Sequence, residues 1–429
     1  MYNYSKLGDK IKRKSKTFIK KISSSLSKPK YKFLFQMFYG LLASQSVKLS
    51  DISRALEEDI TLKKTIDRLS RNLKKFEGIK NVITPHLKNM DHLIQDDTIF
   101  CIDHTDIVKP NSKVLEDLDR VRDGSTGNIE DGYKIFEIAA LTSKKKMPIS
   151  VYSELFSTKS DGFISENTIT LNGFKTLSKH FGNKGVRALD RGFDNNKFYK
   201  YFLKNNEKFI IRNKMNRNVI YNGKSLNILT VAKKYKGKYR LDYFTKNNKK
   251  KKLKISYVPV KLPAKPEKQL TMVVVYGIGK TPMMLLTNIT SDKKIIAKSI
   301  TKAYLLRWRI EDYFKFKKQQ FDFEDIRVQS LKSIKNLNQI LTLVISFIGL
   351  LSKKQNKTIF VMEIFDKAKA IYSEKDLKFT YYRLADGIKN ILAKVKTGIQ
   401  HLITKSKKLQ SQQLSFDKYF DSNGYLDLV

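Results

Sequence analysis

Three carboxylates in this sequence stand where they could support metal-dependent chemistry on phosphate esters. Asp103 follows a short apolar run at 98–102, Asp190 follows a second run at 186–189, and Glu311 lies in a helix-like segment. Carboxylates at the carboxyl ends of strands face the crevice where sheet proteins bind ligands. Three of them can hold two Mg²⁺ ions beside a phosphodiester and still leave room for water. Each Asp alone is equally compatible with a strand-end cap or turn.

The surroundings of Glu311 are more specific, because basic and aromatic residues recur on its side of a predicted helix. With Tyr304 at 0°, a spacing of about 100° per residue puts Arg307, Glu311 and Lys318 at about 300°, 340° and 320°. Lys317 falls at about 220°, off this stripe. A carboxylate flanked by Tyr, Arg and Lys can bind a metal beside a bound phosphate. The alternative is an ordinary Arg–Glu pair on a solvated helix.

The elements expected to position these residues alternate between strands and helices. Strands are predicted at 98–102, 134–141 and 148–156, then a helix at 167–181, a strand at 186–189, a helix at 195–205 and a strand at 208–212. This order describes an α/β, ribonuclease-H-like fold with helices packed on a mixed sheet.

Five regions follow from the change of pattern along the chain. Residues 1–95 are expected to form a helical, basic DNA-binding region, and 96–214 the first part of the catalytic core. Residues 215–290 are predicted to be a β-rich insertion, since short strand-like stretches alternate with Gly, Asn and Lys turns. The second part of the core, with the Glu-bearing helix, occupies 291–352. A helical region and polar tail occupy 353–429.

Within the first region, two short helices suggest a helix-turn-helix unit. Ser50 is placed to cap a helix at 51–58, and Thr61 to cap a second at 62–76. The exposed face of the second helix is predicted to contact DNA through its basic residues, Lys63, Lys64, Arg68 and Arg71. Any helical hairpin with a solvated basic face would show the same pattern.

The charge balance indicates a polyanionic partner. The chain has 85 Lys and Arg against 41 Asp and Glu, a formal net charge of +44. Nucleic acid is the commonest partner for such an excess, with an anionic membrane surface as the rival. Lys-rich usage typical of an AT-rich genome would also raise this number. The apolar run at 340–351 is too short to cross a bilayer, so we expect a buried helix and no membrane.

Cysteine usage narrows the chemistry further. The one cysteine, Cys101, excludes a disulfide framework or a cysteine-based zinc site within one chain. No Gly-rich phosphate loop is present, so no nucleotide cofactor is expected. We expect a bacterial cytoplasmic protein associated with the nucleoid.

Together these motifs resemble the insertion-sequence-4 type of DDE transposases. That family shows Asp with Thr two positions on, then Asp-Arg-Gly-Tyr/Phe, then Tyr-x2-Arg-x3-Glu-x6-Lys. This chain has Asp103 with Thr105, then 190–193, and then the four residues of the stripe at that spacing. One departure is His104, where relatives often carry a second Asp.

The resemblance implies a DNA transposase that cuts transposon ends and joins them to target DNA, with end cleavage, a hairpin intermediate and strand transfer as the steps. It implies Asp103, Asp190 and Glu311 as catalytic ligands of two Mg²⁺ ions, with Mn²⁺ able to substitute. Tyr304, Arg307 and Lys318 would then contact DNA phosphates. The implied partners are double-stranded inverted-repeat ends, target DNA and a second copy in a homodimer on DNA. The alternatives are a non-catalytic DNA-binding derivative and a structure-selective nuclease.

Overall fold

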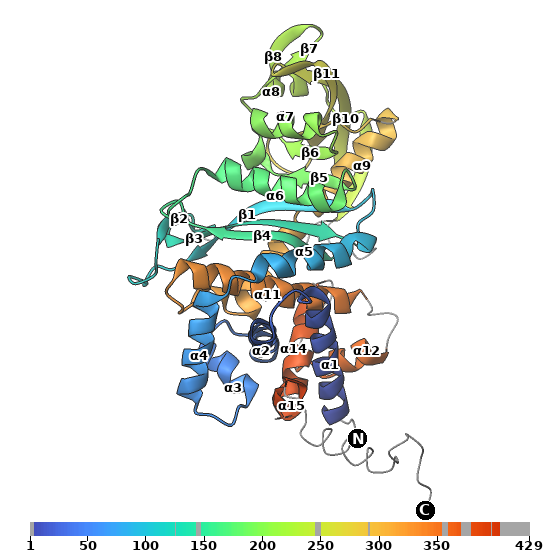
Figure 1. The fold of residues 1–429 in the computed structure, drawn as a ribbon. Helices are drawn as coiled ribbons and strands as arrows, with labels where there is room; N and C mark the ends of the chain where they lie inside the picture. Colours follow the sequence, from blue (N-terminus) through green and yellow to red (C-terminus); the bar gives the residue numbers. More distant parts are fainter. Residues whose placement is uncertain are drawn as a thin grey trace, which may run out of the picture.

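The computed structural model of the protein describes residues 4–124, 126–142, 147–244, 250–290, 292–353, 359–369, 379–395 and 397–403 (Figure 1). The lysine run at 144–146, predicted to be a turn, and the predicted polar tail from Leu409 lie outside the described residues.

The catalytic core predicted from the sequence is a five-stranded arrangement within a larger mixed sheet. Its strands lie in the order β4-β3-β1-β5-β6, with β1, β3 and β4 antiparallel and β1, β5 and β6 parallel. Helices α6 and α7 connect β4 to β5 and β5 to β6. This strand order, with those two crossovers, is a ribonuclease-H-like fold. The bounds are β1 Ile99–Val108, β2 Asp119–Arg122, β3 Ile129–Leu141, β4 Pro148–Phe156, α6 Glu166–Phe181, β5 Val186–Leu189, α7 Asn196–Lys204 and β6 Phe209–Arg212.

The residues predicted to form a β-rich insertion extend this same sheet. Strand β12 pairs antiparallel with β6, and β11, β10 and β7 continue outward from it. The free edge of β6 is therefore paired rather than exposed, which removes an unpaired row of backbone groups. The bounds are β7 Asn218–Tyr221, β8 Lys224–Asn227, α8 Ile228–Lys233, β9 Tyr239–Phe244, β10 Lys250–Leu262, β11 Lys265–Tyr276 and β12 Met283–Thr287.

Helices from both ends of the chain form one bundle on the side of the core opposite the extended sheet (Figure 1). Buried Phe38 of α2, Phe347 of α11 and Leu384 of α14 belong to one apolar cluster. The N-terminal helices therefore share their core with helices some 300 residues later in the chain. The helices of this side are α1 Tyr4–Ile22, α2 Lys28–Ser44, α3 Leu49–Leu56, α4 Leu62–Lys75, α5 Ile79–Met90, α10 Arg309–Gln320, α11 Leu331–Ser352, α12 Ile359–Phe365, α14 Tyr381–Val395 and α15 Gln400–Ile403. Helix α9, Lys293–Leu306, packs instead on the extended sheet.

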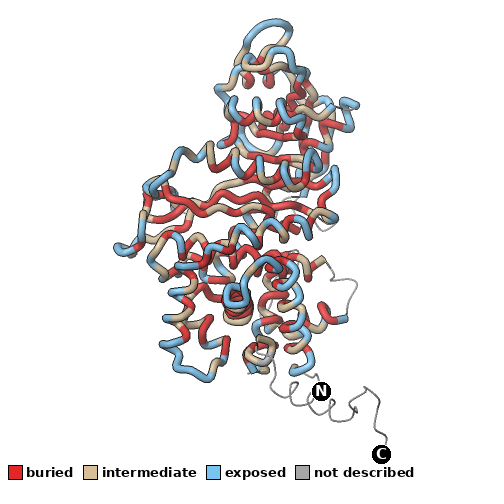
Figure 2. Tube along the Cα trace, viewed as in Figure 1, coloured by how far each residue is buried: buried red, intermediate tan, exposed pale blue. Residues whose placement is uncertain are grey.

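Helix α11 contains the apolar run predicted to be a buried helix. It is the one helix of the described residues long and apolar enough to cross a membrane, and 83% of its most apolar window is buried within the protein (Figure 2). Its apolar residues pack against β4 and the helical bundle. The prediction of a buried helix is confirmed, with bounds wider than the apolar run itself.

Side chains of β1 alternate between the two faces of the sheet. Phe100 and Ile102 pack in the cluster that contains α6 and α7, whereas Cys101 and Ile107 pack in the cluster that contains α10 and α11. Because Asp103 shares the parity of Cys101, its side chain lies on the face toward α10. His104 lies on the opposite face.

Candidate active site

Asp103 and Asp190 lie next to each other across two parallel strands. The register pairs Ile102 of β1 with Leu189 of β5, so the two aspartates are the next residues along each strand. The expectation that Asp103 ends its strand is wrong. β1 continues to Val108 because its other neighbour, β3, pairs with it along its whole length. The parallel pairing with β5 ends at Ile102 and Leu189, so both carboxylates lie just past its end.

The turn that carries Asp190 is fixed by a local cap and by an aromatic stack. The Asp190 side chain accepts a 2.7 Å hydrogen bond from the Gly192 amide, at the start of a short 3₁₀ turn. One residue after Gly192, the Phe193 ring stacks on His104, with ring centroids 5.1 Å apart and 9° between planes. Burial lowers the pKa of His104 to about 4, so this imidazole is neutral. The departure at His104 therefore serves packing that ties β1 to the Asp190 turn.

Arg307 connects the first aspartate with Glu311. Its Nη1 donates to Asp103 Oδ2 at 2.5 Å, and its Nη2 lies 3.9 Å from Glu311 Oε1. The Arg307 side chain is only 6% exposed, whereas that of Glu311 is 49% exposed. Burial raises the pKa of Asp103 to about 6, although Arg307 opposes that shift. Burial alone would lower the pKa of Arg307, but the Asp103 carboxylate raises it above the ordinary value.

The predicted single helix from Tyr304 to Lys318 is two helices. α9 ends at Leu306 and α10 begins at Arg309. At the junction the Arg307 amide donates to the Tyr304 carbonyl at 3.0 Å and the Ile310 amide to the Arg307 carbonyl at 3.0 Å. These are three-residue rather than four-residue spacings, so the turn is tighter there. An unbroken 100° wheel therefore does not describe this segment.

The junction places the four motif residues in different surroundings. Tyr304 is fully buried among the apolar side chains of α9 and the extended sheet. The Arg307 guanidinium carbon lies 5.8 Å from the centre of the Tyr304 ring. Lys318 is at the surface and pairs with Glu324 at 3.0 Å. Arg307 and Glu311 thus lie with Asp103 at the site, Tyr304 supports Arg307, and Lys318 lies two turns further along α10.

Lys317, which the helical wheel places off the stripe, is a buried cation. It is 1% exposed, and its Nζ lies 3.2 Å from Glu137 Oε2 on β3. Thr342 and Ser153 also accept from it, at 3.2 and 3.4 Å. Glu137 is the cross-strand partner of Asp103 and is itself fully buried. This ion pair holds α10 on the sheet at β3, the strand next to the one that carries Asp103. No motif spacing predicted this ion pair.

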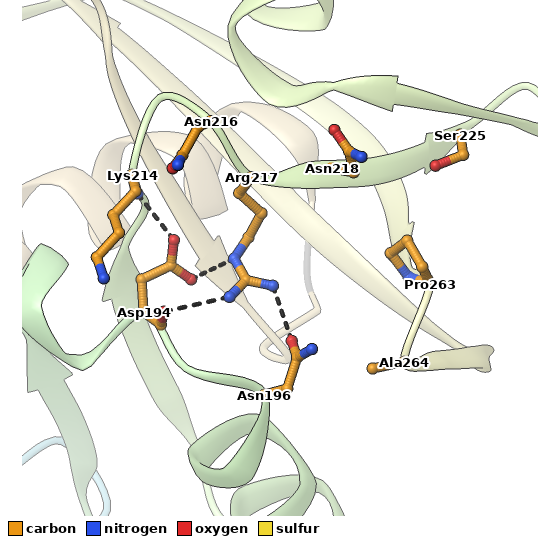
Figure 3. A pocket seen from close by; sticks show the side chains of 9 residues that line it. All are labelled: Asp194, Asn196, Lys214, Asn216, Arg217, Asn218, Ser225, Pro263 and Ala264. Carbon is orange, nitrogen blue, oxygen red and sulfur yellow. Dashed lines mark hydrogen bonds and ion pairs between the residues drawn. The ribbon is translucent and has the colours of Figure 1, made fainter.

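Asp194 is a second residue that the sequence did not single out. It follows Asp190 by four positions and joins that turn to the first strand pair of the extended sheet (Figure 3). Its carboxylate accepts from the Lys214 amide at 2.8 Å and from Asn213 at 3.0 Å, and it forms an ion pair with Arg217. Arg217 also donates to Asn196 at 2.8 Å. Asp194, Asn196 and Arg217 line a polar cavity of about 380 Å³. Their contacts hold in place the segment that follows the Asp190 turn.

The predicted N-terminal helix pair is present as α3 and α4, but its caps differ. α3 begins at Leu49, after Lys48, so Ser50 lies inside the helix, and Thr61 precedes α4 without a side-chain capping bond. Lys63, Lys64 and Arg71 are exposed on α4. Arg68 instead donates to Gln36 at 2.9 Å and pairs with Glu58, which holds α4 to α2.

Comparison with known proteins identifies the family. Residues 94–347 match the family model described as the transposase DDE domain, which is more than half of the chain. The chain belongs to the DDE transposase family. No curated protein matches it. Among solved structures it is similar to a piggyBac transposase synaptic complex with hairpin DNA, at 12% identity and a TM-score of 0.42. That similarity covers 99% of this chain and 88% of the other.

DDE transposases generally use divalent metal ions, and the donor chemistry at this site suits them. Asp103 and Asp190 place hard oxygen ligands side by side, which is what Mg²⁺ prefers. Within the described residues, no three His, Cys, Asp or Glu side chains form a group that could hold one ion. Glu311 is separated from Asp103 by the Arg307 guanidinium, which here supplies the positive charge between them.

Proposed function

We propose that this transposase cuts DNA at the ends of a mobile element and joins the freed ends to target DNA. The observation that carries the proposal is the adjacent pair Asp103 and Asp190, with Arg307 and Glu311 on the same side of the sheet. The charge of +44 supports DNA as the partner.

Each step of the proposed reaction hydrolyses one phosphodiester bond or exchanges it for another. Water attacks a phosphodiester at the element's end and leaves a 3′-hydroxyl. That hydroxyl attacks the opposite strand and closes a hairpin, releasing the flanking DNA. Water then opens the hairpin, and the 3′-hydroxyl attacks a phosphodiester of the target. No step consumes a nucleotide cofactor, because each phosphodiester bond that breaks is either hydrolysed by water or replaced by a new phosphodiester bond.

The residues of the chain would divide the work as follows. Asp103, Asp190 and Glu311 would hold two Mg²⁺ ions, or Mn²⁺ in their place, which when bound stabilise charge on the reacting oxygens. Arg307 already neutralises Asp103 and is poised to hold a phosphate oxygen once that carboxylate binds a cation. Lys318 would contact a phosphate further along the end, and we propose that two copies assemble on DNA.

Isosteric variants test the assignment directly. Asp103→Asn, Asp190→Asn and Glu311→Gln keep side-chain shape but remove the charge that a cation needs. Each should abolish cleavage of an end duplex while binding to that duplex stays within a few-fold of the native protein. Full strand cutting by any of them with Mg²⁺ present would refute the assignment. Joining of a labelled end to plasmid DNA separates a transposase from a nuclease or a non-catalytic binding protein.

A further inference from the structure

Positive charge is concentrated in the residues that extend the sheet beyond the catalytic core. Residues 214–268 contain 17 Lys and Arg but only 2 acids, Asp242 and Glu267. This short stretch therefore holds +15 of the formal +44 of the chain. Lysine-rich codon usage would raise lysine throughout the chain, and it does not explain a local excess. A local excess indicates a binding surface.

The strand pair β9–β10 sorts its side chains cleanly between two faces. Leu241 of β9 pairs with Leu253 of β10, and both are buried against α9. The alternate positions face outward, where Arg240 lies opposite Lys254 and Asp242 opposite Lys252. Arg240, Lys252 and Lys254 are all exposed.

A tight loop adds two more cations to this face. Gly237 has a φ of +94°, and a Cβ at this position would lie 2.3 Å from the Cβ of Lys254, so only glycine fits. Its amide donates to Ser256 Oγ at 3.0 Å, which fixes the loop against β10. Lys236 and Lys238 on either side of Gly237 are exposed. We call Lys236, Lys238, Arg240, Lys252 and Lys254 the basic hairpin face.

The charges on this face are poorly balanced by the protein itself. Directly opposite like charges, such as Arg240 and Lys254, disfavour strand pairing. The single acid of the two strands, Asp242, pairs with Lys250 at 2.9 Å. Lys252 and Lys254 are two residues apart, or about 6.6–6.8 Å along a strand. That is about twice the axial repeat of phosphates along one DNA strand, about 3.4 Å.

We propose that the basic hairpin face binds the sugar-phosphate backbone of double-stranded DNA without reading its sequence. The proposal rests on the proposed function, since it supplies a contact for the DNA that the catalytic residues cut. The lysine ammonium is a compact point charge that suits phosphate oxygens, and phosphate contacts carry no sequence information directly. The extended sheet and α4 lie at opposite ends of the molecule (Figure 1), so the two surfaces would contact different stretches of DNA.

Salt-dependent binding tests the proposal. The variant Arg240→Gln/Lys252→Gln/Lys254→Gln should lower the slope of log affinity against log salt by about 0.9 for each lost phosphate contact, so by up to about 2.7. The matched control removes three exposed lysines from α6 and α7, Lys175→Gln/Lys179→Gln/Lys204→Gln. The probe is a labelled duplex of arbitrary sequence. Equal slopes for the hairpin variant and the control would overturn the proposal.

Two further measurements keep the outcome decisive. In the native protein, DNA should protect Lys252 and Lys254 from acetylation but leave Lys175 reactive, which needs no variant to fold. Loss of binding to anionic phospholipid vesicles with an unchanged DNA slope would overturn the proposal in favour of a membrane. The Asp103→Asn protein separates the two hypotheses, because retained cleavage refutes the catalytic assignment while the binding slope still reports on the hairpin.

Discussion

Lys317 and Lys318 are neighbours in the sequence, yet their replacement should affect different properties. Lys317 is buried against Glu137, which has no exposed surface. Lys317→Ala would leave that carboxylate without its cation, which costs about 3–5 kcal/mol of folding free energy. Lys318 shares a partly exposed ion pair with Glu324, and losing such a pair costs about 0–1 kcal/mol.

These energies convert into melting temperatures that can be told apart. An unfolding entropy of about 2.1 cal/mol/K per residue gives about 0.9 kcal/mol/K for a chain of this length. If the chain unfolds as one unit, Lys317→Ala should therefore lower the Tm by about 3–6 °C. Lys318→Ala should change it by about 1 °C or less. Glu137→Gln/Lys317→Met removes both charges and should recover much of the loss, because no unpaired charge remains.

The assay combines thermal unfolding with single-turnover cleavage of an end duplex well below the Tm. Lys318→Ala should reduce cleavage by roughly tenfold or more through a lost charge-assisted phosphate contact. Lys315→Ala, at an exposed position of the same helix, is the matched control and should leave both quantities near native values. The reasoning fails if Lys317→Ala is no less stable than this control, or if the double variant is as unstable as the single one.

Arg307→Ala should lower single-turnover cleavage roughly ten- to a hundredfold, whereas Arg309→Ala, in a partly exposed pair, should cost much less; equal losses would contradict a specific role at the site. Burial lowers the pKa of His86 from 6.5 to about 4. The neutral, buried imidazole therefore contributes its full folding free energy above pH 6.5. This contribution is lost on acidification, because His86 of the unfolded chain takes up a proton first. Urea titrations should show up to about 3 kcal/mol lost between pH 6.5 and 4 that His86→Phe does not lose; an identical pH slope in both proteins would exclude this cause. Lys64→Gln/Arg71→Gln in the full chain should weaken binding to end DNA, measured by footprinting, and unchanged protection would remove α4 from the DNA interface.

Much of the core could be predicted because local pattern and burial agree there. Strands β4 and β5 have the bounds expected from apolar and β-branched runs, α6 begins one residue earlier than expected, and α7 is one residue shorter at each end. The motif spacings predicted Asp103, Asp190, Arg307 and Glu311 as site residues, because metal and phosphate binding require particular residue types at fixed intervals. Bounds failed where pairing, not propensity, sets them, as in β1, which continues past Asp103 because β3 continues beside it.

The sequence by itself determined the family, the strand and helix order of the core and the candidate carboxylates, because these depend on residue types and on distances along the chain. The tertiary structure alone decided which charges are solvated and which are buried. Lys317 lies beside Glu137, 180 residues away, and is an interior cation. Arg68 lies beside Glu58 and Gln36, so it is not the free surface cation that its helical position suggested. No local pattern encodes such partners, because a buried charge is stabilised by whatever the fold brings to it.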